Sequence, residues 1–276
     1  MTEDSARSPL TAPALASLVG EQGPLSALAV TAASPSTNSQ LLEALADDPH
    51  AWPHMSALVT DHQTSGRGRA GRAWETPRGA ALTVSFVLRP GLSEESWGLI
   101  PLAVGLAAVR TLRADGVEAS LKWPNDVVVR TADAPIPGWG TYRKVAGILC
   151  ERREDAVVAG IGVNVSQTEQ ELPVPHAASL ATLGGHHLDR RALLDALARH
   201  VADAVGQAER DPDGLLADLA ALTFTLGQHV VVEREGQPPL TGDAVALAAS
   251  GALLVRAGDG ATHEVHAGDV RLRTAT

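Results

Sequence analysis

The sequence predicts an α+β fold, in which helices flank a mixed β-sheet and a small β-barrel follows at the C-terminus. Strand-like segments follow one another closely between residues 118 and 165, without the helices that would separate them in a βαβ repeat. Apolar residues return to helical spacing between 191 and 222. From Gly227 onward, short β-rich runs alternate with glycine-containing turns, which is typical of a small barrel.

The same change of pattern places a domain boundary near residues 224–227. Residues 1–30 are rich in Ala, Ser, Pro and Leu with little periodicity, which indicates a short arm with one helical turn near 13–19. We therefore expect an arm at 1–30, a large domain at 31–224 and a small domain at 225–276.

The large domain is expected to open with a helix. Leucines at helical spacing between 41 and 45 predict it, and the hydroxyl and amide side chains of residues 36–38 are suited to its N-terminus. Strands are predicted at 57–61 and 81–88, and the glycine- and arginine-rich stretch at 66–79 between them is expected to be mobile.

A second helix is predicted from Ser93 through Leu112, because the two glutamates after Ser93 favour a helix N-terminus. Four strands should follow at 118–122, 126–129, 145–151 and 156–165. Two helices are then predicted at 191–210 and 212–222, and the barrel strands at 230–232, 244–247, 253–255 and 264–266.

Charge and cysteine content exclude several classes of protein. With 32 acidic residues against 22 lysines and arginines, the net charge of -10 should repel a nucleic-acid backbone. The single cysteine, Cys150, excludes internal disulfides, and the ten histidines form no convincing metal-ligand set. No secretory signal or bilayer-spanning apolar run is present, so we expect a soluble cytoplasmic protein.

The segment from Gly66 to Trp74 is the most informative motif. Its three glycines let the backbone approach a ligand, and Arg67, Arg69 and Arg72 supply permanently charged forks for carboxylate and phosphate. We interpret it as a mobile clamp for anions. An RNA-contacting arginine–glycine stretch is the alternative, which a single copy in an acidic chain disfavours.

Lysine is rare, because only Lys122 and Lys144 stand beside 20 arginines. A chain so biased toward arginine is expected to keep lysine where the chemistry needs a compact ammonium on a flexible stem. Lys122 opens the run Lys-Trp-Pro-Asn-Asp, which ends at Asp126 and could hold phosphates and their magnesium through water. An ordinary β-turn with solvated charges explains that run equally well on its own.

The two glycine-containing strands are candidates for the walls of a ligand site. Lys144 begins a strand in which Gly147 would let a flat ligand lie against the backbone. Asn164 ends a second such strand, and a buried amide there needs a partner, which either a ligand or a structural bulge supplies. Cys150 is interpreted as a core thiol rather than a nucleophile.

Taken in order, these motifs resemble the biotin–protein ligases. The matching segments cover about residues 30–165 and are Ser36-Thr37-Asn38, Gln63, Gly66 to Trp74, Lys122 to Asp126, Lys144 with Ala146 to Leu149, and Gly160 to Asn164. The resemblance implies a catalytic domain like that of class II aminoacyl-tRNA synthetases, followed by an SH3-like barrel. It also implies activation of biotin with ATP and Mg²⁺ to biotinyl-5′-AMP, and transfer to a lysine of the biotin carboxyl carrier protein of an acyl-CoA carboxylase.

The resemblance further implies roles for individual residues. Lys144, Arg67 and Arg69 would be catalytic, with Lys144 at the carboxylate and α-phosphate and the arginines closing over the intermediate. Asp126 would reach Mg²⁺ through water. The biotin-binding residues would be Ser36, Thr37, Asn38, Gln63, Gly66, Arg67, Gly68, Arg69, Lys144 and Gly147. The ATP-binding residues would be Arg67, Arg69, Lys122, Trp123, Asn125, Asp126 and Asn164.

Some features depart from the family pattern or leave a choice. About 35 residues precede Ser36, so we expect no N-terminal DNA-binding domain and no nucleic-acid or membrane partner. The stretch at 131–142 is longer than the tight hairpin expected before Lys144. A lipoate-type ligase and a non-catalytic regulator are the alternative functions, and a monomer and a weak homodimer are both open.

Overall fold

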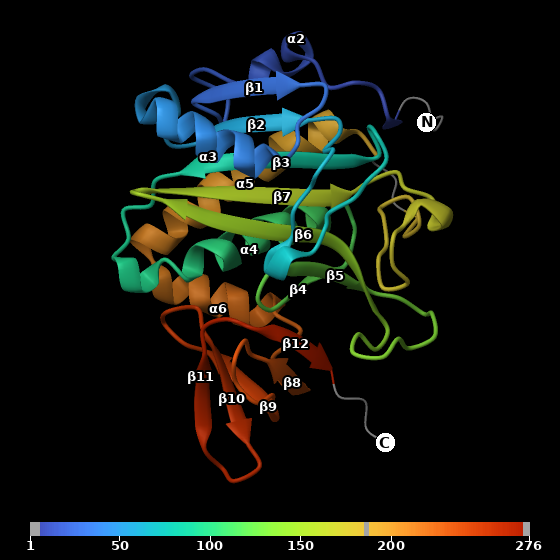
Figure 1. The fold of residues 1–276 in the computed structure, drawn as a ribbon, viewed down its shortest axis with the longest axis vertical. Coiled ribbons are helices and arrows are strands. Elements are labelled where there is room, and N and C mark those ends of the chain that lie inside the picture. Colours follow the sequence, from blue (N-terminus) through green and yellow to red (C-terminus); the bar gives the residue numbers. More distant parts are fainter. Residues whose placement is uncertain (1–5, 185–187, 273–276) are drawn as a thin grey trace.

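The computed structural model describes residues 6–184 and 188–272, which form two sheets with flanking helices (Figure 1). The larger sheet has seven strands in the order β1-β2-β3-β7-β6-β5-β4. Only β1 and β2 pair in parallel, and the other neighbours are antiparallel, which confirms the predicted mixed sheet. Its strands are β1 (Ala27–Thr31), β2 (Ser56–Thr60), β3 (Ala81–Leu88), β4 (Ala119–Lys122), β5 (Asp126–Arg130), β6 (Tyr142–Arg153) and β7 (Ala156–Asn164).

Helices cover both faces of this sheet. The large hydrophobic core lies under α4 (Leu99–Ala114), α5 (Arg190–Arg210) and α6 (Pro212–Leu222), and a smaller core lies under α3 (Thr37–Asp47) on the opposite face. Neighbouring residues of β2 divide between the two cores, as the alternation of side chains along a strand requires. The short elements are α2 (Ala12–Leu15), η1 (Ala16–Leu18), η2 (Pro49–Ala51), η3 (Arg69–Gly71), η4 (Glu94–Ser96) and η5 (Glu169–Glu171).

The start of α4 corrects one sequence prediction. The helix begins at Leu99 rather than at Ser93, whose side chain makes no capping hydrogen bond, and residues 94–96 form a separate 3₁₀ turn. Pro101 explains the difference. In a helix starting near 93 it would lie in the interior, lose a backbone hydrogen bond and clash with the preceding turn, whereas the first turn tolerates it.

The N-terminal region is better ordered than the arm that its composition indicated. Leu10, Leu15, Leu18 and Leu25 are at most 9% exposed and belong to the large core, and β1 forms one edge of the sheet. Short turns rather than a regular period direct these leucines inward, which is why the hydrophobic pattern did not reveal them. The described part of this region is thus integral to the large core.

The C-terminal residues form a separate antiparallel sheet in the order β11-β10-β9-β8-β12, which confirms the predicted β-rich end of the chain. Its strands are β8 (His229–Glu233), β9 (Leu240–Leu247), β10 (Leu253–Ala257), β11 (Thr262–Val265) and β12 (Asp269–Leu272), the last of which was not predicted. The Trp123 indole donates to the carbonyl of Gly251 at 3.1 Å, and so anchors this sheet to the larger one. No helix among the described residues is long and apolar enough to cross a membrane.

Candidate active site

A cavity of about 1060 Å³ lies between the larger sheet and β12. The loop that joins β2 to β3 crosses β7 and β6 on the same side as α3 and forms part of its wall (Figure 1). The structure brings most of the predicted site residues together there: Ser36, Thr37, Asn38, Gln63, Arg67, Gly68, Arg69, Lys122, Asn125, Asp126, Lys144, Gly147 and Asn164.

Two predicted site residues do not line this cavity. Trp123 is 1% exposed, and its indole is engaged in the core, so the structure places it outside the expected ATP-binding surface. Gly66 lies at the base of the loop, where a Cβ atom would come within 2.2 Å of the backbone oxygen of Trp74. That close approach explains the glycine without any ligand contact.

One end of the cavity is a network of uncharged polar groups at the N-terminus of α3. Ser36 caps the helix, and the backbone N–H of Thr37 donates to Oε1 of Gln63 at 2.9 Å. The hydroxyl of Ser85, which sequence reasoning missed, lies 2.7 Å from the Thr37 hydroxyl and 2.6 Å from Oδ1 of Asn38. This end therefore presents the uncharged donors and acceptors that could hold the polar head of a small molecule.

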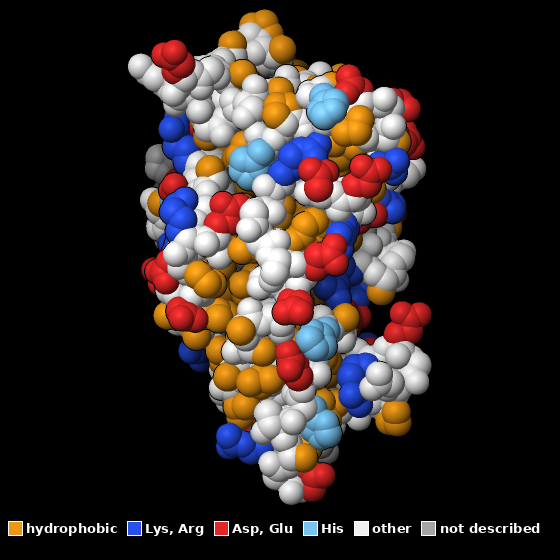
Figure 2. All heavy atoms as spheres, turned by 90° about the vertical axis from the view of Figure 1, so that its left-hand side faces the viewer, with side chains coloured by type: hydrophobic (Ala, Val, Ile, Leu, Met, Phe, Trp, Pro, Cys, Tyr) orange, Lys and Arg blue, Asp and Glu red, His pale blue; other side chains and the backbone are white. Residues whose placement is uncertain are grey.

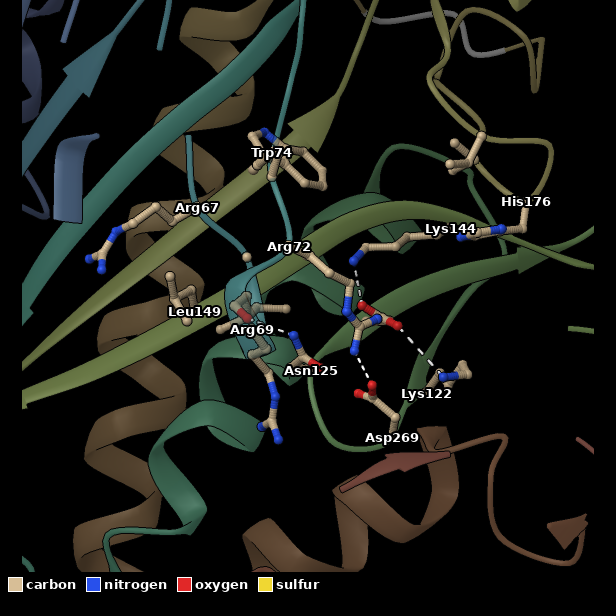
Figure 3. Close-up of a pocket in the computed structure, with 18 of the residues that line it drawn as sticks. Arg67, Arg69, Arg72, Trp74, Lys122, Asn125, Lys144, Leu149, His176 and Asp269 are labelled. Atoms are coloured by element: carbon tan, nitrogen blue, oxygen red, sulfur yellow. Dashed lines mark hydrogen bonds and ion pairs between the residues drawn. The ribbon is translucent and has the colours of Figure 1, made fainter. Parts of the chain in front are cut away.

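The arginines of the loop differ in where they point. Arg67 donates to both carboxylate oxygens of Glu151, at 2.7 and 2.8 Å, and Glu151 also accepts from Asn38. Figure 3 shows Arg67 and Arg69 directed away from the lysines, whereas Arg72 points toward them and contacts Asp269 of β12. The hydrogen bond that Arg72 donates to Asp269 raises the pKa of Arg72. All three arginines line the cavity, but Arg72, which the sequence analysis gave no individual role, is the one directed toward the lysines.

Two ammonium groups surround one carboxylate at the other end of the cavity. Nζ of Lys144 lies 2.6 Å from Asp126, and Nζ of Lys122 lies 3.6 Å from it (Figure 3). Burial lowers the pKa of Lys122, against the attraction of Asp126. Burial also opposes ionisation of Asp126, but the charges of Lys144 and Lys122 hold its pKa below the ordinary value. The excess of positive charge fits an anionic ligand.

The donor set here does not fit a magnesium ion held by the protein. Both oxygens of Asp126 face ammonium groups, and the described residues contain no group of three His, Cys, Asp or Glu side chains placed to hold a metal. A hard divalent cation requires several oxygen ligands. The described residues therefore offer no site that would hold Mg²⁺ by protein ligands alone, and the contact of Asp126 with Mg²⁺ through water, which the resemblance implied, stays a prediction.

Glycines in β6 and β7 make room for a tryptophan of the loop. A Cβ atom at Gly162 would lie 2.5 Å from the Trp74 ring, and one at Gly147 would lie 2.9 Å from Nζ of Lys144. The Cβ atom at Gly147 would also lie 3.4 Å from the Trp74 ring, so the flat group beside Gly147 is Trp74 of the chain itself. The indole N–H of Trp74 is buried against Gly162 and has no acceptor among the described residues.

The segment at 131–142 forms the wall beside Lys122. Trp139 stacks on His176 with ring centres 4.2 Å apart, and Nζ of Lys122 lies 4.6 Å from the centre of the Trp139 ring. Burial lowers the pKa of His176, and the charge of Lys144 adds to this effect. The unusual length of this segment is thus explained by its place in the cavity wall.

Asn164 and Cys150 have structural environments. The side chain of Asn164 donates to the carbonyl of Ala178 at 2.9 Å and accepts from Gln167 at 2.9 Å, so protein groups supply the partners that it needs. Burial raises the pKa of Cys150 to about 12, which agrees with the interpretation of an unreactive thiol.

Comparisons with known proteins agree with this geometry. A model of the biotin/lipoate A/B protein ligase family matches residues 31–167, and one of the biotin protein ligase C-terminal domain matches residues 225–273. The chain is 34% identical over 258 residues to the biotin–acetyl-CoA-carboxylase ligase of Mycobacterium tuberculosis, covering 92% of this chain and 91% of that protein. The chain belongs to the biotin protein ligase family.

Other biotin protein ligases support the assignment. The bifunctional ligase/repressor BirA of Escherichia coli is 30% identical over 183 residues, which span 64% of this chain and 52% of that protein. The biotin protein ligase of Aquifex aeolicus in complex with biotin and ATP is 29% identical with a TM-score of 0.74, covering 91% of this chain and 100% of that chain. The fold and the ligase family are therefore shown over most of the length.

Several residues of this biotin protein ligase site were missed by sequence reasoning: Ser85, Trp139, Glu151, His176 and Asp269. Arg72 was predicted only as one of the three arginines of the anion-binding loop, without an individual role. The others come from separate elements that meet only after folding, and no local pattern in the sequence marked them.

Proposed function

We propose that this biotin protein ligase activates biotin with ATP to biotinyl-5′-AMP and then transfers biotin to a lysine of a biotin carboxyl carrier domain. One observation carries the proposal. A single cavity joins an uncharged polar end, at Ser36 and Gln63, to an end where the cations Lys122, Lys144 and Arg72 outnumber the carboxylates Asp126 and Asp269. A neutral polar head with an acidic tail, next to a polyphosphate, matches that arrangement.

In the first step, the biotin carboxylate attacks the α-phosphorus of ATP and pyrophosphate leaves. Ser36, Thr37, Asn38 and Gln63 would bind the polar head of biotin, and its apolar chain would pass Trp74 toward Lys144. Because two anions approach each other, a fixed ammonium near the reacting atoms lowers the barrier. Asp126 would keep Lys144 in place through their 2.6 Å contact.

The nucleotide would lie at the lysine end of the cavity. Lys122 and Asn125 line this end, as does Arg72 of the loop, and these groups can contact phosphates. Arg67 is now held by Glu151, so it would reach the intermediate only after the loop rearranges. We keep for Arg67 and Arg69 the role of closing over biotinyl-5′-AMP and excluding water.

In the second step, the uncharged amine of the acceptor lysine attacks the acyl carbon of biotinyl-5′-AMP. An amide bond forms, AMP leaves, and the amine gives up a proton. We propose a carboxylase carrier domain as the acceptor, since the Mycobacterium tuberculosis relative is named for acetyl-CoA carboxylase. The proposed organisation keeps 31–224 as the catalytic domain, with residues 6–30 packed into its core, and 225–276 as the small domain.

We also propose a cytoplasmic protein that binds no nucleic acid, as a monomer or weak homodimer. The net charge is -10, and on the face that Figure 2 shows basic side chains are interspersed with acidic ones and form no continuous stripe. The one cysteine requires no oxidising compartment.

Exchange of labelled pyrophosphate into ATP, run separately with biotin, lipoate and octanoate, tests the proposal. The expected result is exchange with biotin alone. Exchange with lipoate alone would assign the chain to the lipoate-type alternative, and exchange with none of the acids would favour a non-catalytic regulator.

A further inference from the structure

The segment at 168–177 forms the wall of the cavity beside the two lysines, and β6 fixes its far end. The backbone N–H of Lys144 donates to the carbonyl of His176 at 2.7 Å, and that of Ala178 donates to the carbonyl of Lys144 at 2.8 Å. Pro173 and Val174 line the cavity just before this attachment, and Val174 is 39% exposed. The position of these side chains therefore depends on how the near end of the segment is held.

Arg7 holds the near end. Its guanidinium donates to the two carboxylate oxygens of Glu171 at 2.9 and 2.6 Å. It also donates to the hydroxyl and the carbonyl of Ser166, at 3.2 and 2.8 Å. The hydrogen bond from Arg7, followed by that from the backbone N–H of Thr168, lowers the pKa of Glu171 to about 2. The Arg7 guanidinium thus links the N-terminal region to Ser166 and Glu171, which lie on the two sides of the turn where the wall segment begins.

The backbone around Arg7 is anchored without its side chain. Arg190 is 2% exposed, forms an ion pair with Asp61 at 2.8 Å and donates to the carbonyl of Ser8 at 2.8 Å. The backbone N–H of Leu10 donates to the same carboxylate at 3.3 Å. Removal of the Arg7 guanidinium should therefore release the wall segment and leave residues 8–10 in place.

We propose that Arg7 is a positioning residue for the nucleotide end of the cavity, acting through Glu171 and Ser166 on the wall formed by residues 168–177. The inference rests on the proposed function in one respect, because it assigns that end to ATP. It gives the N-terminal region a part in ATP binding, although the described residues place Arg7 outside the cavity lining.

Steady-state pyrophosphate exchange with the Arg7→Ala variant tests the proposal. We expect the KM for ATP to rise roughly three- to tenfold, because the wall beside the nucleotide is held less firmly, with the KM for biotin unchanged. Arg199→Ala is the matched control, since it removes an exposed pair with Asp195 and a hydrogen bond to the carbonyl of Gln22 in the N-terminal region, neither of which lines the cavity, and it should match the wild type. Equal rises of both KM values, or none, would overturn the proposal.

Hydrogen exchange of backbone amides supplies a readout that needs no activity. In Arg7→Ala, the amides of 168–177 should exchange faster, whereas those of α5 should not change. Unchanged protection of the amides of 168–177 would contradict the role of Arg7 in holding the wall segment. If the wild type shows no biotin-dependent pyrophosphate exchange, the proposed function fails, and hydrogen exchange still decides whether Arg7 holds the wall.

A double-variant comparison separates this contact from general destabilisation. Arg7→Ala and Glu171→Gln remove the two halves of one interaction, so the double variant should raise the KM for ATP no further than the more affected single variant. Multiplication of the two single effects would mean that the residues act independently, which would overturn the proposal.

Discussion

At the scale of single residues, the electrostatics of the site depend on charged groups that are buried close together. Lys122 is 5% and Asp126 8% exposed, so their charges interact with little screening. Lys144 is the most direct link to chemistry, because it contacts Asp126 and also faces the cavity. Negative charge would develop next to its ammonium group during adenylation.

Lys144→Ala should therefore lower the rate of adenylate formation by roughly 10²- to 10³-fold, the usual cost of removing one preorganised donor from a developing anion. Pyrophosphate exchange measures this rate, and circular dichroism checks that the variant is folded. A folded variant with nearly normal exchange would remove Lys144 from the chemistry.

The Trp74 ring provides a second test at this scale. In Gly162→Ala the added methyl group would meet the ring at 2.5 Å, so the tryptophan must shift. Overpacking costs roughly 1–3 kcal/mol, and we expect biotin to bind about tenfold more weakly in calorimetry. Gly258→Ala is the control, since nothing lies within 4 Å of its added atom. Equal biotin affinity in the two variants would refute the role of Trp74.

At the scale of elements, the sequence predicted the helix and strands that carry the motifs better than the irregular segments that line the cavity. Capping side chains and apolar runs predicted α3, β6 and β7, but only the family resemblance joined Ser36, Lys144 and Gly147 into one site. Trp139 and His176 come from irregular segments, where no period predicts contacts. Trp123 was assigned to the site because it lies within a motif, but its indole serves the core.

The segment at 131–142 should support ATP binding through Trp139. Trp139→Ala removes the stack on His176 and the contact with Lys122, and we expect the KM for ATP to rise roughly three- to tenfold. Trp139→Phe retains an aromatic ring and should restore most of the affinity. Comparable losses in the two variants would show that aromatic stacking is not what matters.

The contact between Arg7 and Glu171 also predicts a dependence of stability on pH. The pKa of Glu171 is about 2, below its usual 4.5, so its contribution to stability is complete above about pH 5 and declines as the pH falls toward 2. The difference in free energy of unfolding between wild type and Glu171→Gln, measured by urea titration, should shrink between pH 6 and pH 3. A difference independent of pH would contradict the ion pair.

At the scale of the whole molecule, the cavity depends on both sheets. Asp269 of β12 contacts Arg72 of the loop, and Leu272 donates its backbone N–H to the carbonyl of Gly138 at 3.0 Å. Composition and periodicity predicted the α+β fold and the β-rich C-terminus. They could not predict that β12 closes the cavity, because that contact joins residues far apart in the chain.

The central claim is that one cavity makes biotinyl-5′-AMP and passes it to a carrier lysine. The most direct measurement mixes the protein with biotin and ATP, removes free nucleotide by gel filtration and adds a biotin carrier domain. The account predicts about one biotinyl-5′-AMP retained per chain and its quantitative transfer to the carrier. Failure to form the intermediate, or a retained intermediate that the carrier domain does not consume, would contradict it.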